Sequence, residues 1–423
     1  MTLFISTLNL IAIFGFAALI RRKQDRAIRP LFWPAFIVKL LAGMGLGFIY
    51  QHYYAAGDTF YFFDLAREQA QLFHIHPGSY FDFLWQDTNE EWKGAARSAF
   101  FVKIISIVAI VSQNGYWIAS LWFSLISFLG SIYLVSCIVR FFPDAKWAAA
   151  LAFLFFPSVV FWGSGIIKES IGLAALLLLS AMYLKAMMNQ TPRPVEFVFG
   201  LVGFWIVWNL KYYWIAVFLP VVITSLVVHL SSIRLKIPSL LKLSYWIVLF
   251  VVLCYGVSLS HPNFYIERFL QVVIENHKAF VSVSDSADLI HYESLRADWL
   301  SVLANSPWAL ISGLFRPFLW EADNGLKVLV SLENLLILVL CIASVVRIRG
   351  IFQTQYTLVT LSAMVYVVLL CIFLALSTPN LGSLARYKVG FLPFLIFLIS
   401  YKNPLIQYAF SLPLLKSLKK WFD

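Results

Sequence analysis

Runs of apolar residues long enough to cross a lipid bilayer recur from one end of the chain to the other. A transmembrane helix needs about 20 such residues, because each residue adds about 1.5 Å across a hydrocarbon core of about 30 Å. Hydrophobic residues make up 61% of the 423 residues and charged residues only 13%, against about 45–50% and about 25% in soluble proteins. The sequence therefore predicts an all-α polytopic membrane protein, with residues 1–423 forming a single integral membrane domain.

The apolar runs predict about eleven transmembrane helices. They are expected at residues 3–20, 32–50, 116–139, 147–162, 171–187, 197–210, 214–230, 245–260, 328–346, 356–376 and 389–399. Lys and Arg gather in the short connections between these runs, and an excess of both is typical of cytoplasmic loops. The basic connection at 21–29 therefore places the N-terminus outside.

One apolar run leaves the topology open. Only eleven uncharged residues separate Lys103 from Gly115, which is short for a crossing and more typical of an interfacial or re-entrant helix. If this run crossed the membrane, every later span would cross in the opposite direction. An interfacial helix instead places all later basic connections in the cytoplasm, and for that reason we prefer it.

On this topology two long loops face outward. The first, residues 51–115, is expected to contain interfacial helices, and its segment 51–97 holds seven carboxylates against three cations. The second covers residues 261–326. Residues 404–423 repeat apolar side chains at roughly helical spacing, which predicts an amphipathic tail helix on the cytoplasmic leaflet. Membrane-lying helices are therefore expected in the outer loops and in the tail.

The sequence also excludes several classes of function. It contains no P-loop and no GxGxxG motif, and no cytoplasmic connection is long enough for a nucleotide-binding domain. The net charge of +11 comes from connections beside apolar spans, so it indicates membrane orientation and predicts no nucleic-acid partner. The four cysteines lie in apolar runs without CxxC spacing, and neither HExxH nor a DxD-type pair is found. No metal ion and no other cofactor is predicted.

The first outer loop carries the main candidate for a catalytic residue. Asp58 follows Gly57 a few residues beyond the end of a span, at the depth where headgroups meet water. An ionised carboxylate that faces an enclosed cavity can act as a general base and take a proton from an acceptor hydroxyl. Asp64 lies six residues later on a predicted amphipathic helix and is a secondary candidate. The alternative for both residues is a solvated loop acid.

Lys168 and Glu169 lie together between two predicted spans. Adjacent opposite charges at a membrane boundary are costly unless each has a partner. Gly163 and Gly165 precede them and allow the backbone to bend or to expose its N–H groups. We predict a phosphate-binding role for Lys168 and a catalytic carboxylate at Glu169. The alternative is that both side chains only reach toward the interface at a helix junction.

Further cations lie near the predicted outer surface. Lys211 divides two short apolar runs, while Arg316 and Arg386, the latter followed by Tyr387, each precede an inward span. A guanidinium matches phosphate oxygens with two parallel hydrogen bonds. These four residues are predicted to bind a substrate phosphate, with Glu321 as a secondary site candidate. Anchoring of helix ends at the interface is the alternative.

These features resemble the GT-C class of membrane glycosyltransferases. In that class the first outer loop opens with an Asp followed by aromatic residues and a short Ala-Arg helix, as in the stretch from Asp58 to Arg67. An Arg-Tyr pair followed by Pro is also typical of the last span, as in Arg386-Tyr387 to Pro393. By topology the resemblance covers most of the chain, and its motifs are short. An extra span precedes the usual first one, and a Lys-Glu pair stands where an Asp is common.

The resemblance implies a sugar donor carried on a polyprenyl phosphate, an outward-facing active site and inversion at the anomeric carbon. It matches Asp58 to the catalytic Asp of the class. The expected partners are this donor, membrane lipids and a glycan, lipid or protein acceptor, at a bacterial inner membrane with the site toward the periplasm. Cations near the headgroup plane would stabilise the leaving phosphate, and a closed cavity would suppress hydrolysis.

Two other classes stay open. A polymerase or ligase of surface polysaccharides, such as O-antigen, uses the same kind of donor with a glycan acceptor. A lipid or solute transporter tends to carry ionisable residues at mid-membrane. Here Lys39 is the charge that we place at mid-membrane, while most others lie in loops. This distribution favours chemistry at the outer surface.

Reporter fusions test the predicted topology. Fusions after Arg26, Pro143, Lys236 and Arg349 should report the cytoplasm, because each lies at a basic connection. Fusions after Asp87 and Asp288 should report the outside. A cytoplasmic signal at Asp87 would contradict both the orientation and the outer active site. An outside signal at Pro143 alone would show that residues 103–115 cross the membrane.

Overall fold

The computed structural model describes residues 2–54, 58–85, 96–235, 237–260, 265–346 and 356–413. Within these ranges the protein is built from helices, with one isolated antiparallel bridge between Leu289 and Asn380 and no strand. Hydrocarbon offers no water to satisfy backbone N–H and C=O groups, and a helix satisfies them within itself. The prediction of an all-α fold is confirmed.

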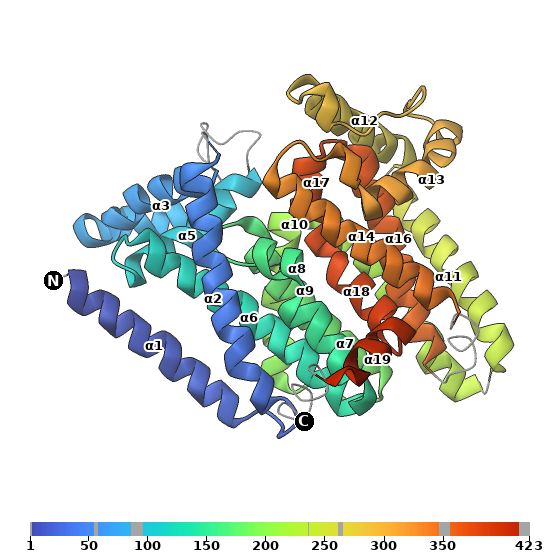
Figure 1. Cartoon of the computed structure of the whole chain (residues 1–423), viewed down its shortest axis with the longest axis horizontal. Coiled ribbons are helices and arrows are strands. Elements are labelled where there is room, and N and C mark those ends of the chain that lie inside the picture. Colours follow the sequence, from blue (N-terminus) through green and yellow to red (C-terminus); the bar gives the residue numbers. More distant parts are fainter. Residues whose placement is uncertain are drawn as a thin grey trace. The chain divides into compact units, whose positions relative to one another are not determined.

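Eight helices in the described part of the chain are long and apolar enough to cross a membrane. They are α1 (Thr2–Arg22), α2 (Arg29–His52), α6 (Tyr116–Phe141), α9 (Lys168–Met187), α10 (Pro194–Leu235), α11 (Ser239–Ser260), α14 (Gly325–Val345) and α16 (Thr357–Ser377) (Figure 1). A bent pair, Leu381–Gly390 with Leu392–Ser400, forms a ninth candidate with an angle of 67° between its parts. The pair contains α17 (Leu381–Tyr387) and α18 (Leu392–Ser400). The protein is therefore a polytopic helical membrane protein.

The span predicted at 147–162 is not a single continuous helix. This segment is divided into α7 (Lys146–Ala150), a π-helical turn (Leu151–Phe155) and α8 (Pro157–Trp162). Phe156 lies between the last two with φ −66° and ψ 123°. Proline sterically disfavours the helical conformation of the residue before it, so the helix breaks at Phe156.

The spans predicted at 197–210 and 214–230 lie on either side of a break in the 42-residue element α10, where Lys211 has the non-helical angles φ −144° and ψ 55°. The predicted division at Lys211 is therefore present. The span at 389–399 is only the second part of the bent pair. By length and composition the described residues provide eight spans, or nine with the bent pair, where the sequence predicts eleven.

Shorter helices occupy the predicted outer loops and tail. They are α3 (Asp58–Ile75), α4 (Pro77–Trp85) and α5 (Ala96–Val111) in the first loop, α12 (Ile266–Ser282) and α13 (Trp299–Phe315) in the second, and α19 (Pro404–Ser411) in the tail. The 16 residues of α5 span about 24 Å, less than the hydrocarbon core of about 30 Å. This length agrees with the interfacial helix preferred at 103–115.

Some predicted features lie outside the described residues. They are Gly57, the parts of the two predicted outer loops at 86–95 and 261–264, the fusion sites at Asp87, Lys236 and Arg349, and the tail beyond Pro413.

The chain divides into two compact units. Unit 1 comprises the described residues of Met1–Met182, Pro192–Tyr213 and Pro413–Asp423, and unit 2 comprises those of Tyr183–Thr191 and Trp214–Leu412. The boundary within α10 follows closely after the break at Lys211.

Close helix packing in unit 1 depends on small residues. α2 and α6 lie side by side (Figure 1), and the Ser120 hydroxyl donates to the Gly43 carbonyl at 3.0 Å. A methyl group at Gly43 would collide with the Ser124 hydroxyl, and one at Gly130 of α6 would lie 2.5 Å from the Ala174 carbonyl oxygen of α9. Small residues are enriched at such interfaces because they let backbones approach closely.

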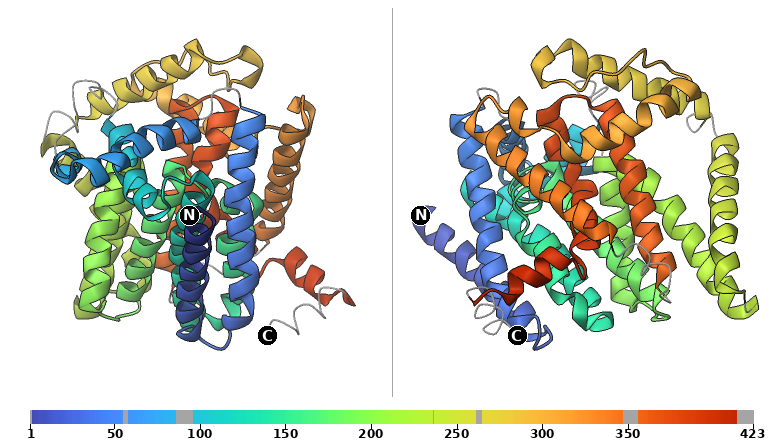
Figure 2. Two further views of the ribbon diagram at one scale, coloured as in Figure 1. Left: turned by 90° about the vertical axis from the view of Figure 1, so that its left-hand side faces the viewer. Right: turned by 45° about the vertical axis from the view of Figure 1, so that its right-hand side comes forward.

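In unit 2, α16 is the central helix and packs against α12, α13 and α18. The ring of Phe269 from α12 stacks on Phe373 of α16 at 5.5 Å. Figure 2 shows α12 running across the end of α16 and not along it. An orientation across the spans agrees with the membrane-lying helix predicted for the second outer loop.

Replacement of Gly130 tests the close approach of α6 and α9. Gly130→Ala should lower the stability by about 1–3 kcal/mol, the usual cost of overpacking, because the nearest atoms are backbone atoms of Ala174. The matched control is Gly45→Ala on α2, where nothing lies within 4 Å of the added methyl. Thermal unfolding in detergent measures both variants, and equal midpoints would contradict this packing.

Candidate functional site

A buried turn joins α8 to α9 in unit 1. All residues from 163 to 167 are buried, and non-helical backbone at membrane depth needs partners within the protein. Gly165 has φ +69°, a conformation that favours glycine, and its N–H donates to the Ser124 hydroxyl at 3.1 Å. The Ile166 carbonyl accepts from the Thr59 hydroxyl at 2.8 Å. The turn is thereby fixed to both α6 and α3.

Asp58 is the first residue of α3, and its side chain is exposed. The next residue, Thr59, is fully buried and contacts the Tyr116 hydroxyl at 2.9 Å. The Phe60 ring stacks on the Tyr116 ring at 4.0 Å. These contacts hold the first turn of α3 against the buried turn, and Asp58 begins this turn at the surface of unit 1.

Asp64 has a different environment on the same helix. Its carboxylate pairs with Arg67 at 3.2 Å, and the two side chains are 57% and 47% exposed. Exposed pairs of this kind contribute about 0–1 kcal/mol. The structure therefore places Asp64 as a solvated acid on the surface of α3.

Glu169 and Lys211 form a buried ion pair. The Lys211 ammonium lies 2.5 Å from Glu169 Oε1, and the side chains are 0% and 5% exposed respectively. Lys211 is also the residue at which α10 loses its helical conformation. Each charge is compensated by the other, which supports a structural role for both residues.

Three further contacts surround the buried ion pair. The Lys168 ammonium donates to the Ser98 hydroxyl at 2.8 Å and lies 4.7 Å from the centre of the Phe62 ring. The Arg97 guanidinium lies 4.7 Å from the centre of the Tyr212 ring. Together with the buried ion pair, these contacts join the first turns of α5 and α9 to the break in α10. We call Arg97, Ser98, Lys168, Glu169, Lys211 and Tyr212 the junction.

The junction carries an excess of positive charge. It holds three cations and one carboxylate, a net charge of +2. Glu169 and Lys211 are buried, whereas Lys168 is partly exposed and Arg97 is exposed, so the excess lies on the accessible side. Arg97 was not among the predicted site residues, because a single cation in the first turn of a short helix is not distinctive.

Arg316 and Glu321 are brought together in unit 2. The Arg316 guanidinium donates from Nε to both Glu321 oxygens at 2.9 and 3.1 Å, and its Nη2 lies 2.6 Å from Oε1. Nη2 also donates to the Leu289 carbonyl at 3.5 Å, and the Arg316 carbonyl accepts from the Lys388 ammonium at 2.9 Å. The guanidinium is therefore already occupied by a carboxylate of the chain.

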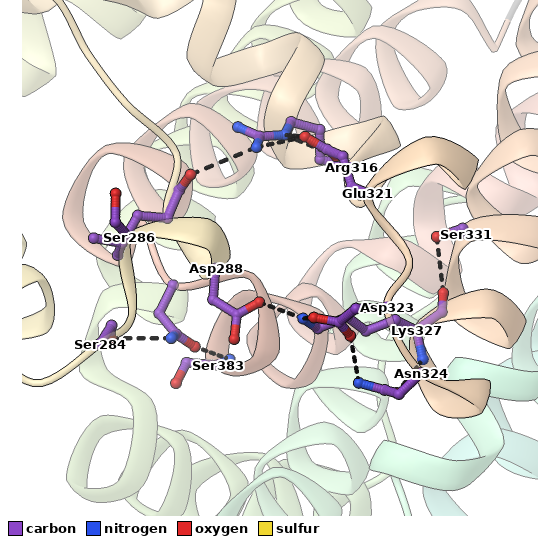
Figure 3. A network of polar contacts seen from close by, with 12 residues as sticks. Ser284, Ser286, Asp288, Arg316, Glu321, Asp323, Asn324, Lys327, Ser331 and Ser383 are labelled. Atoms are coloured by element: carbon purple, nitrogen blue, oxygen red, sulfur yellow. Dashed lines mark hydrogen bonds and ion pairs between the residues drawn. The ribbon is translucent and has the colours of Figure 1, made fainter.

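A second group of charges fixes the same part of unit 2 (Figure 3). The Lys327 ammonium lies between Asp288 at 2.6 Å and Asp323 at 2.5 Å. Its hydrogen bond to Asp323 lowers the pKa of that carboxyl below its usual value. The Asn380 amide donates to the Ser284 hydroxyl at 3.0 Å. These bonds hold residues 284–288 against the N-terminal ends of α14 and α17.

Arg386 and Tyr387 end α17 and are half-buried. They directly precede Lys388, whose ammonium binds the Arg316 carbonyl. The predicted site residues thus fall into two groups. Asp58, Lys168, Glu169 and Lys211 are in unit 1, and Arg316, Glu321, Arg386 and Tyr387 are in unit 2.

A metal site is not evident in the described ranges, where no three His, Cys, Asp or Glu side chains are grouped so as to hold an ion. The absence of a cofactor stays a prediction.

Comparison with known proteins finds no matching protein family, no matching curated protein and no matching solved structure. The function of this chain is therefore argued from its own residues and from the motifs in its sequence.

The buried ion pair can be tested by its effect on stability. Glu169→Gln should destabilise the protein by about 3–5 kcal/mol, because it leaves the Lys211 ammonium buried without a counter-charge. The double variant Glu169→Leu with Lys211→Met should recover most of this loss, since two apolar side chains can replace a buried pair. Thermal unfolding in detergent is the measurement. Asp64→Asn, which breaks an exposed pair, is the control, and an equal loss in both single variants would contradict the buried pair.

Proposed function

We propose that this protein is a membrane glycosyltransferase that moves a sugar from a polyprenyl-phosphate donor to an acceptor at the outer face of the membrane. The observation that supports this most is the position of Asp58. Its carboxylate is exposed, and the neighbouring Thr59 fixes the helix against a buried turn. One helical turn later, the Phe62 ring lies against the ammonium of Lys168. A carboxylate and a cation thus belong to the same packed part of unit 1.

In the proposed reaction, Asp58 accepts the proton of the acceptor hydroxyl as that oxygen attacks the anomeric carbon. The bond between this carbon and the phosphate oxygen breaks, and polyprenyl phosphate leaves with the bonding electron pair. Attack opposite the leaving group inverts the configuration. A positioned general base contributes about 10²–10⁴-fold to such a step.

The proposed site for the leaving phosphate in unit 1 is the accessible side of the junction. Lys168 and Arg97 supply its positive charge, and fixed charges of this kind stabilise a negative charge that develops during the reaction. The ion pair between Glu169 and Lys211 holds these helices in place in this proposal, and Glu169 is the next carboxylate to test after Asp58. In unit 2, Arg386 and Tyr387 remain phosphate-binding candidates, while Arg316 is engaged by Glu321.

The proposal includes the eleven-span, GT-C-like topology at a bacterial inner membrane. The eight long helices and the bent pair supply nine crossings. A division of α10 at Lys211 supplies a tenth, and the broken segment from Lys146 to Trp162 supplies the eleventh. The active site would face the periplasm. A glycan acceptor at the same site would make the protein a surface-polysaccharide polymerase or ligase.

Asp58→Asn is the direct test of the proposed base. It preserves the size and much of the hydrogen bonding of the side chain but removes its basicity, so turnover should fall by roughly 10²–10⁴-fold while the stability and donor binding stay close to the wild type. The measurement is turnover in liposomes beside a donor-binding titration.

Asp64→Asn is the matched control, because this acid lies on the same helix in an exposed ion pair. It should retain nearly full turnover. Near-normal turnover of Asp58→Asn would exclude Asp58 as the base, and equal losses in both variants would point to damage of α3 instead.

A further inference from the structure

Lys39 of α2 is a buried cation that the proposed function does not use. The residue is 2% exposed, and its ammonium makes no hydrogen bond to any described residue. Lys211 is buried to a similar degree but has Glu169 as its partner. An ionisable side chain within a membrane span is costly and is expected to have a partner. The lack of one among the described residues points to a partner from outside.

The packing of α2 places Lys39 against α6. Phe36, three residues before Lys39, packs on Phe128 at 5.2 Å between ring centres. Gly43, four residues after it, lies against Ser124. Residues three and four apart share one face of a helix. Lys39 therefore faces α6 at the level between Ser124 and Phe128.

Two other features lie at this level. Ser127 of α6 is fully buried, and its hydroxyl has no partner among the described residues. On the side of the buried turn, the Lys39 ammonium fills space left by a glycine, because a β-carbon at Gly163 would lie 2.8 Å from Nζ. An ammonium and a hydroxyl, both buried and both unsatisfied, thus occur at one depth inside unit 1.

The described part of unit 1 offers no carboxylate to compensate Lys39. Glu169 is its only buried carboxylate, and it is bound to Lys211. The acids Asp25, Asp58, Asp64, Glu68, Asp82 and Asp144 are exposed, and Glu196 accepts from the Arg193 backbone N–H. A buried charge is strongly unfavourable without a counter-charge.

We propose that Lys39 and Ser127 bind a small monovalent anion of the halide class. One ammonium compensates one negative charge, so a monovalent anion leaves the site neutral, whereas sulfate or a phosphate dianion would leave a buried negative charge. The low exposure of Lys39 favours an anion of small radius. The ammonium and the serine hydroxyl both supply hydrogen-bond donors for it. This site is independent of the proposed glycosyl transfer.

The test is the thermal unfolding midpoint of the purified full chain in detergent, at constant ionic strength, as sodium gluconate is replaced by sodium chloride or bromide. A ligand that binds the folded protein stabilises it by mass action. The midpoint of the wild type should therefore rise with halide and then saturate, and sulfate should not reproduce the rise. Lys39→Met should abolish the response, and Ser127→Ala should weaken the apparent halide affinity about fivefold.

Lys185→Met is the control, because Lys185 is also a buried lysine, in the last turn of α9 and in unit 2. It should keep the halide response. A wild-type midpoint that is equal in halide and gluconate would overturn the proposal, as would a full response in Lys39→Met or an equal response to sulfate. If Lys39→Met does not fold, the wild-type comparison of halide, gluconate and sulfate together with Ser127→Ala decides the question.

Discussion

The ion pair between Glu169 and Lys211 is the contact on which the organisation of unit 1 depends. Two opposite charges in an apolar interior are tolerated only when they form an ion pair, because each charge alone would be strongly destabilising. This ion pair requires the first turn of α9 to lie beside the point at which α10 loses its helical conformation. The neighbouring residues Lys168 and Tyr212 then contact Ser98 and Arg97 of α5. One buried pair thus positions three helices and leaves the remaining positive charge on the accessible side.

The buried turn before α9 connects the ion-paired helices to α3, the helix that carries the proposed base Asp58. Gly165 adopts a conformation that favours glycine and binds Ser124, and Ile166 binds Thr59. Because Thr59 directly follows Asp58, the turn also fixes the helix that carries the carboxylate. A general base must lie within hydrogen-bond reach of the proton that it removes, so a fixed helix backbone favours this role. The same turn contains Gly163, whose missing side chain leaves room for the ammonium of Lys39.

Sequence reasoning succeeded where a single physical quantity decides the outcome. The length of apolar runs predicted the long helices, and the charge of Lys211 predicted the division of α10. It missed the break within 147–162, because the segment contains enough apolar residues for a span but Pro157 interrupts the helix. Most side-chain contacts between residues far apart in the sequence could not be predicted. Glu169 and Lys211 are 42 positions apart, and no spacing rule joins residues at that separation. The roles assigned to Asp58, Arg386 and Tyr387 stay predictions.

The central claim is glycosyl transfer from a lipid-linked donor, and the release of the carrier lipid tests it most directly. The purified protein in liposomes would be incubated with a set of polyprenyl-phosphate sugars, with and without glycan, lipid and protein acceptors, and free polyprenyl phosphate would be quantified. The account predicts release that requires an acceptor and equals the amount of sugar transferred, with inverted anomeric configuration in the product. No acceptor-dependent release from any such donor by the folded protein would contradict it.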